Sequence, residues 1–86
     1  MNRVLGMTQA KRDAAVDADE LLQLGLRYCL GREVPRDLIL AHKWFNLAAM
    51  RGSDSAKQYR LEIAREMPSS DVAEAQRQAR AWLQTH

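Results

Sequence analysis

The sequence predicts an all-α protein, and three observations carry that prediction. Apolar residues recur at spacings of three and four in four successive segments from Asp17 onward, as they do on one face of a helix. Glycine or proline separates each segment from the next. No stretch alternates apolar and polar residues with β-branched enrichment, so no β-sheet is expected. The 86 residues are expected to form a single domain, with a thin core because 13 of them are alanine.

The first predicted helix begins after Asp17 and ends at Gly31. Asp17 is followed three residues later by Glu20, which is the spacing of a capping box at a helix start. A glycine at the end of the apolar pattern is typical of a helix C-terminus. The apolar stripe between these ends comprises Leu21, Leu24 and Tyr28.

The second predicted helix follows a short connector, residues 32–36, and extends to Gly52. Either Asp37 caps this helix or Pro35 opens it as a first-turn residue. Its apolar face comprises Leu38, Ala41, Phe45 and Ala48, and is widened by Ile39, Trp44 and Leu47. An apolar arc this wide predicts a helix that is buried on more than one side.

Two more helices are predicted after Gly52. Ser53 is in position to cap the third helix, and the segment Pro68-Ser69-Ser70 is expected to break the chain before the fourth. The stripe of the third helix comprises Ala56, Tyr59, Ile63 and Met67. The stripe of the fourth helix comprises Val72, Ala75, Ala79 and Trp82.

Eleven residues of the segment 18–52 stand in a characteristic order and spacing. They are Leu24, Gly25, Tyr28, Gly31, Val34, Asp37, Ala41, Trp44, Ala48, Ala49 and Gly52. This pattern resembles one full Sel1-like repeat, and the resemblance implies a TPR-like antiparallel helix hairpin. Gly25 then lets the second helix approach the first closely. Glu33 stands where the family usually has a second glycine, so either the connector differs from its usual conformation or Glu33 is slightly strained.

The resemblance divides the single domain into three parts. Residues 17–52 form the Sel1-like repeat. Residues 53–86 are expected to form a degenerate half repeat and a C-terminal capping helix, together a capping helix pair; part of this segment resembles the tail of bacterial Sel1-like proteins. Residues 1–16 are an N-terminal lead-in, either a short helix or a frayed, partly disordered segment. Because a repeat leaves an apolar face open, the core is closed either by the flanking helices or by another chain.

Charge and hydropathy exclude several classes of function. The net charge of +2 lies entirely in residues 1–16, since residues 17–86 carry ten basic and ten acidic residues. A nucleic-acid-binding domain usually carries a basic stripe on its folded part, so no nucleic-acid partner is expected. No apolar run is long enough to span a bilayer, so no membrane association is expected. Residues 1–13 lack the apolar segment of a secretory signal, which predicts a cytoplasmic protein.

The sequence offers little for catalysis. It contains no phosphate-binding loop, HExxH or Gly-x-Ser-x-Gly motif, so we expect no enzyme, catalytic residue, cofactor, metal or small-molecule substrate. Cys29 has apolar neighbours and is interpreted as a small buried core residue. His42 is interpreted as a structural histidine, either exposed or packed. The mixed charges of the last two helices, Arg60 among them, are interpreted as a solvated surface, and Trp44 and Trp82 as core anchors.

The resemblance implies a protein–protein interaction module, because Sel1-like proteins act mainly as adaptors that hold partners on a concave surface lined by the first helix of each repeat. A peptide or protein partner is therefore expected on first-helix residues outside the matched packing set. These residues are Gln23, Leu26, Arg27 and Leu30. Alternatively, Leu26 and Leu30 contact the N-terminal segment or a second subunit. The second hypothesis for function is a self-associating structural domain whose open repeat edge forms a homodimer.

Overall fold

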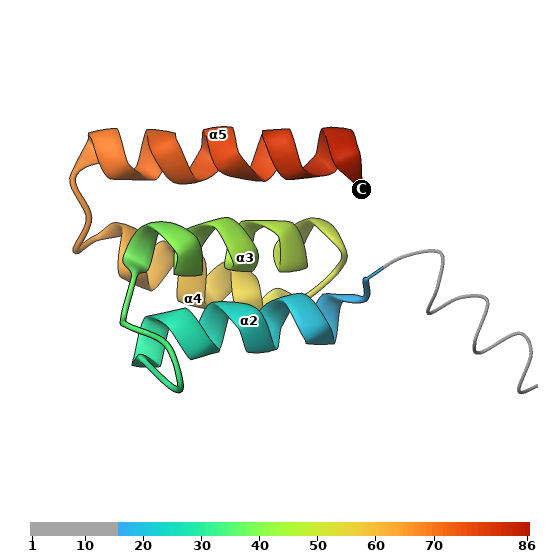
Figure 1. Ribbon diagram of the computed structural model, residues 1–86, viewed down its shortest axis with the longest axis horizontal. Helices are drawn as coiled ribbons and strands as arrows, with labels where there is room; N and C mark the ends of the chain where they lie inside the picture. Colours follow the sequence, from blue (N-terminus) through green and yellow to red (C-terminus); the bar gives the residue numbers. More distant parts are fainter. Residues whose placement is uncertain (1–15) are drawn as a thin grey trace, which may run out of the picture.

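The computed structural model describes residues 16–86 and contains four α-helices in this range, which confirms the all-α prediction. The helices are α2 (Ala18–Leu30), α3 (Leu38–Met50), α4 (Asp54–Ala64) and α5 (Ser69–Thr85). Successive helices run in opposite directions along the molecule, and α3 lies between α2 and α5 (Figure 1). The expected lead-in, residues 1–16, lies outside the described residues apart from Val16.

Side-chain caps begin three of the four helices, as the sequence predicts. The caps of α2, α3 and α4 are Asp17, Asp37 and Ser53. Each side chain accepts a hydrogen bond from the backbone N–H three residues later, at 2.9, 3.0 and 3.1 Å respectively. Asp37, not Pro35, therefore begins α3. The break before α5 lies earlier than expected, because α4 ends at Ala64 and α5 starts at Ser69, directly after Pro68. Met67, predicted on the stripe of the third helix, therefore lies in the connection after α4, where it is still buried in the core.

Positive backbone φ angles occur where the chain turns after α2 and α3. Gly31 ends α2 with a φ of 69°, and Gly52 follows the end of α3 with a φ of 103°. Glu33 in the α2–α3 connector also has a positive φ, at 65°. This left-handed conformation costs a non-glycine residue roughly 1–2 kcal/mol. Of the two alternatives for Glu33, strain is the one the structure supports.

Helix α3 is the centre of the fold. It packs against α2, α4 and α5, and its contact with α2 is the most extensive in the molecule. Its buried side chains are Ala41, His42, Phe45, Leu47 and Ala48. This confirms that the wide apolar arc of the second helix is covered on more than one side.

A ring of α3 packs directly on the backbone of α2 at Gly25. A Cβ added at Gly25 would lie only 2.4 Å from Cδ1 of Phe45, so the bare glycine backbone makes room for the ring. Phe45 is fully buried and stacks on Tyr59 of α4, with ring centroids 5.3 Å apart. One aromatic ring thus joins α2, α3 and α4. The role expected for Gly25 in close helix packing is confirmed.

Helix α5 is held on α3 by small residues and an aromatic pair. Ala75 and Ala79 are buried, and Trp82 meets Trp44 edge to face with ring centroids 5.8 Å apart. Such a pair contributes about 0.5–1.5 kcal/mol beyond its burial. Both indole rings are half-buried and contact the core, as expected of anchors.

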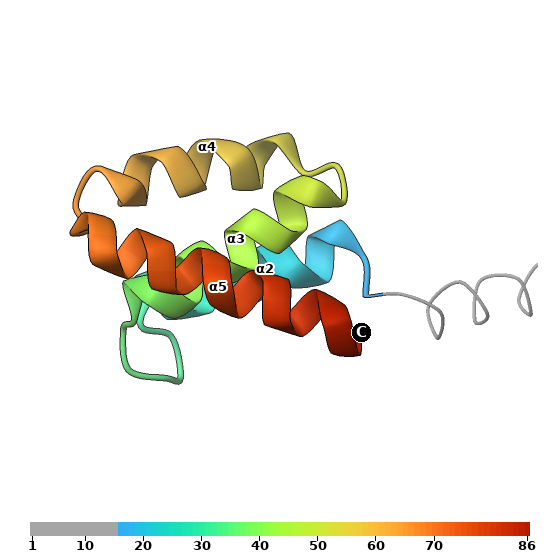
Figure 2. The same ribbon diagram turned by 90° about the horizontal axis from the view of Figure 1, so that it is seen from above.

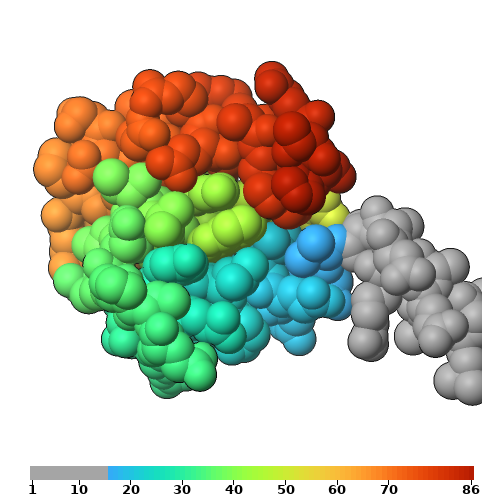
Figure 3. All heavy atoms as spheres, in the orientation of Figure 1, coloured from blue at the N-terminus to red at the C-terminus, as the bar shows by residue number. Residues whose placement is uncertain are grey.

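The two C-terminal helices differ in one respect from the capping pair that the sequence predicts. Both pack on α3, but they have little contact with each other. Figure 2 shows them joined at the turn after α4 and diverging away from it. On the other side of α5, a band of α3 remains visible between α5 and α2 (Figure 3). The helices diverge because each buries its own apolar stripe on α3.

Replacing Gly25 by alanine should lower the free energy of unfolding by about 1–3 kcal/mol through overpacking. The loss should appear although alanine favours helix over glycine by about 1 kcal/mol. The Phe45 ring has nowhere to move, because it is buried and stacked on Tyr59. Urea denaturation followed by circular dichroism measures the effect. In a Phe45→Leu background the same replacement should cost less; equal costs in both backgrounds would contradict the contact.

Candidate functional site

The four residues predicted to bind a partner lie on one face of α2, since they occupy positions i, i+3, i+4 and i+7. Gln23, Leu26 and Arg27 line a shallow depression of about 130 Å³ together with Arg32 and Glu33 of the connector. The fourth predicted residue, Leu30, is outside this lining and is 54% exposed at the end of the helix. We call the surface formed by Gln23, Leu26, Arg27 and Leu30 the α2 face.

Leu26 and Arg27 of the α2 face differ in how firmly they are held by the rest of the protein. Leu26 is half-buried against the core, and any contact that it makes with residues 1–15 lies outside the described part of the chain. Arg27 Nε lies 3.7 Å from Glu33 Oε1, and both side chains are largely exposed. Exposed ion pairs contribute about 0–1 kcal/mol, so this pair is weak. A carboxylate of a partner can therefore compete with Glu33 for the guanidinium.

A second and larger hollow lies between α4 and α5, and its volume is about 350 Å³. Residues from three helices line it: His42, Asn46, Arg60, Leu61, Ala64, Val72 and Gln76. We call it the α4–α5 groove. It exists because these two helices pack separately on α3, whose side chains form the floor. The sequence analysis did not predict this groove.

His42 is the unusual residue of the groove. It is packed, with 2% of its surface exposed, which agrees with one of the two interpretations of the sequence. Its Nδ1 atom is buried and has no hydrogen-bond partner among the described residues. An unpartnered buried polar atom costs about 1–3 kcal/mol. Burial lowers the pKa of His42, and the nearby Arg60 guanidinium lowers it further.

Arg60 is not the freely solvated surface residue that the sequence analysis expected. It is half-buried, and its Nη1 donates a hydrogen bond of 2.7 Å to Oδ1 of Asn46 on α3. Asn46 thus holds the guanidinium at the groove. One local signal was available in the sequence, because His42 and Asn46 are four residues apart and share a face of their helix. Nothing local indicates that Arg60 would meet them.

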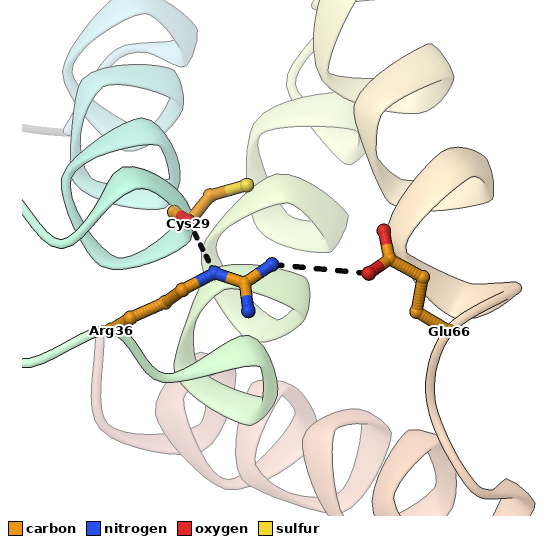
Figure 4. Close-up of polar contacts among 3 residues, drawn as sticks. All are labelled: Cys29, Arg36 and Glu66. Atoms are coloured by element: carbon orange, nitrogen blue, oxygen red, sulfur yellow. Dashed lines mark hydrogen bonds and ion pairs between the residues drawn. The ribbon is translucent and has the colours of Figure 1, made fainter.

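Cys29 is half-buried and contacts the core. Burial raises the pKa of its thiol; the Arg36 cation opposes this rise, and Glu66 and Glu62 add to it. Arg36 itself lies between two helix ends, where its Nε donates to the Cys29 carbonyl at 3.0 Å and its Nη2 lies 3.9 Å from Glu66 Oε1 (Figure 4). The raised pKa disfavours a reactive thiolate. The role of Arg36 is structural, because its side chain satisfies a backbone carbonyl at the C-terminal end of α2.

Two further features of the described residues bear on function. Within residues 16–86 no group of three or more histidine, cysteine, aspartate or glutamate side chains is placed to hold a metal ion. Among the helices of this same range, none combines the length and the apolar character needed to cross a membrane.

Comparison of the chain with protein-family models, with curated proteins and with solved structures finds no match. The resemblance to the Sel1-like repeat therefore rests on the eleven residues and their spacing alone.

Acidification should destabilise the protein through His42. Its pKa in the folded state is below the ordinary value of 6.5, so the unfolded chain takes up the proton first. Its contribution to stability is complete above that ordinary value and is lost as the pH falls through it. Urea denaturation at several pH values from about 7.5 to about 5.5 should show a falling free energy of unfolding. His42→Gln should remove most of this dependence, whereas the control His86→Gln should keep it; the opposite pattern would contradict the assignment.

Proposed function

We propose that this chain is a protein–protein interaction module that binds a peptide or a segment of a partner protein on the α2 face. The observation that carries the proposal is the placement of the predicted residues. Three of the four line one depression, and the fourth, Leu30, is exposed beside them. Residues chosen from the sequence thus lie together on one accessible face.

The same proposal treats α2 and α3 as a Sel1-like repeat of the TPR-like class. Several observations support it: the two helices are antiparallel, they make the most extensive contact in the molecule, and the Phe45 ring of α3 packs on Gly25 of α2. The family pattern places Gly25 at such a contact. Under this proposal, the module acts as an adaptor without catalytic activity.

The chemistry of the α2 face indicates what it would bind. Leu26 and Leu30 offer apolar surface one turn apart, and Arg27 lies beside them with only a weak ion pair. A partner segment with an apolar side chain next to a carboxylate would complement all three. Arginine is one of the residue types enriched at the energetic centres of protein interfaces, whereas leucine is under-represented there, so Arg27 is the main anchor that this face offers.

Self-association through an open repeat edge has less support. A row of exposed side chains along α4 is polar and consists of Ser55, Gln58, Glu62 and, directly after the helix, Arg65; Tyr59 and Leu61 of α4 are exposed as well. Terminal units of stacked repeats carry such a polar outer face, which keeps them soluble. The row therefore favours a chain that closes its own core.

The peptide-binding proposal predicts that a charge at Leu30 abolishes binding. The probe is a peptide selected from a displayed random library on the immobilised wild-type chain. Leu30→Asp, or Arg27→Glu, should weaken its binding by about tenfold or more, because the first variant puts a charge on exposed apolar surface of the face and the second reverses the charge of its arginine. Leu83→Asp is the matched control, since Leu83 is 37% exposed on α5, and it should bind normally. Equal binding by wild type and Leu30→Asp would refute this binding face.

The polar row along α4 leads us to expect that the protein is a monomer in solution. Light scattering behind a sizing column should give a mass near the 9.8 kDa of one chain at every concentration tested. A dimer of constant mass across the series would favour the self-associating alternative, and the partner site would then have to be sought away from the dimer contact.

A further inference from the structure

The α4–α5 groove lies on different residues from the α2 face, with no residue common to the two linings. Its chemistry is not that of an ordinary solvated surface. Arg60 is the one charged side chain in the lining, and no carboxylate lines it. The remaining polar groups are the side chains of His42, Asn46 and Gln76. The lining thus has one positive charge and no negative charge to balance it.

Two observations show that the polar side of the groove is built to receive a ligand. Asn46 uses its side-chain oxygen to hold the Arg60 guanidinium, which leaves the other N–H groups of Arg60 for a further acceptor. His42 lines the groove, is 2% exposed, and has a buried Nδ1 without a partner. Buried polar atoms of native proteins are almost always hydrogen-bonded, so an orphaned one marks a place for a missing partner.

The rest of the lining is apolar. Leu61, Ala64 and Val72 line the side nearest the turn at which α4 and α5 join. Figure 2 shows the two helices converging at that turn and diverging away from it. A polypeptide passing through would meet the turn, whereas a chain end can enter from the wide side and stop there.

The exposure of the rim distinguishes a peptide from a small molecule. Leu61 is 47% exposed and Gln76 is also exposed, so the groove is open along its sides. Sites for small ligands usually bury 70–90% or more of the ligand. An open groove of this kind suits the end of a longer chain, whose preceding residues remain outside.

We propose that the α4–α5 groove binds the C-terminal carboxylate of a peptide whose last side chain is apolar. The carboxylate accepts hydrogen bonds from the free N–H groups of Arg60, next to the His42 ring in the floor, and the last side chain packs toward Ala64 and Val72. The charge of the ligand balances the unmatched guanidinium. This site does not depend on the α2 face and can exist with or without it.

The test uses N-acetylated pentapeptides of alanine that end in valine, leucine or isoleucine, each made as the free acid and as the C-terminal amide. Binding to the full chain is followed by NMR, from the shifts of backbone amides and of the His42 ring. The free acid should shift groove residues, and the amide should bind about tenfold to a hundredfold more weakly, because it lacks the charged acceptor. Equal binding of acid and amide would overturn the proposal.

Two pairs of variants keep the test independent of folding defects. Gln76→Glu places a carboxylate at the exposed rim and should weaken binding of the acid peptide by about tenfold or more through like-charge repulsion. Its control is Gln84→Glu, on an exposed position of α5 outside the groove. Arg60→Gln should likewise abolish binding, with the exposed Arg65→Gln as its control. Normal binding by Gln76→Glu would overturn the proposal.

Other occupants of the groove are distinguished in the same experiment. N-acetylvaline at equal affinity would show that the peptide chain contributes nothing, and that the groove takes small acids instead. Groove shifts that grow with protein concentration in the absence of peptide would identify a second copy of the chain as the occupant. Either result would overturn the peptide assignment. The binding of library peptides to the α2 face is measured separately with Leu30→Asp, so failure of one site does not imply failure of the other.

Discussion

The close approach of α2 to α3 at Gly25 is the constraint on which the rest of the structure depends. The absence of a side chain there admits the Phe45 ring, which is then enclosed completely. Full burial of such a ring stabilises the fold by about 1.5–3 kcal/mol. The same ring is stacked on Tyr59, so this contact also helps to position α4. A larger residue at position 25 would move α2 and disturb the whole three-helix contact.

Because α4 and α5 both pack on the central α3, a space remains between these two helices. Helix α5 is attached to α3 by buried alanines and by the Trp44–Trp82 contact, and not by α4. Because α4 and α5 do not close over α3, side chains of α3 that would otherwise be core become the floor of a groove. His42 and Asn46 occupy that floor, and Arg60 reaches it from α4. Polar groups therefore gather at a place that the helix-to-helix packing leaves uncovered.

The two surfaces differ in how they are held. The α2 face consists of consecutive turns of one helix and a weak, exposed ion pair, so its groups can adapt to a partner. The groove draws its polar groups from different helices, and a hydrogen bond already orients its guanidinium. A pre-positioned site favours a small, defined chemical group, whereas an adaptable face favours a longer segment. The two proposals thus assign different ligands for physical reasons.

The sequence alone determined where α2, α3 and α4 begin, where α2 ends and which face of α3 is apolar, because caps and helical stripes depend on residues only three or four positions apart. Asp37 at the start of α3 and Gly31 at the end of α2 act in this local way. It also indicated the face shared by Gln23 and Leu30, for the same reason. Only the tertiary structure decided that α5 packs on α3 and leaves α4, and that Arg60 meets Asn46, fourteen residues away in the sequence. Those contacts depend on which of several exposed or apolar groups finds its partner after the helices pack, and local periodicity contains no information about that choice.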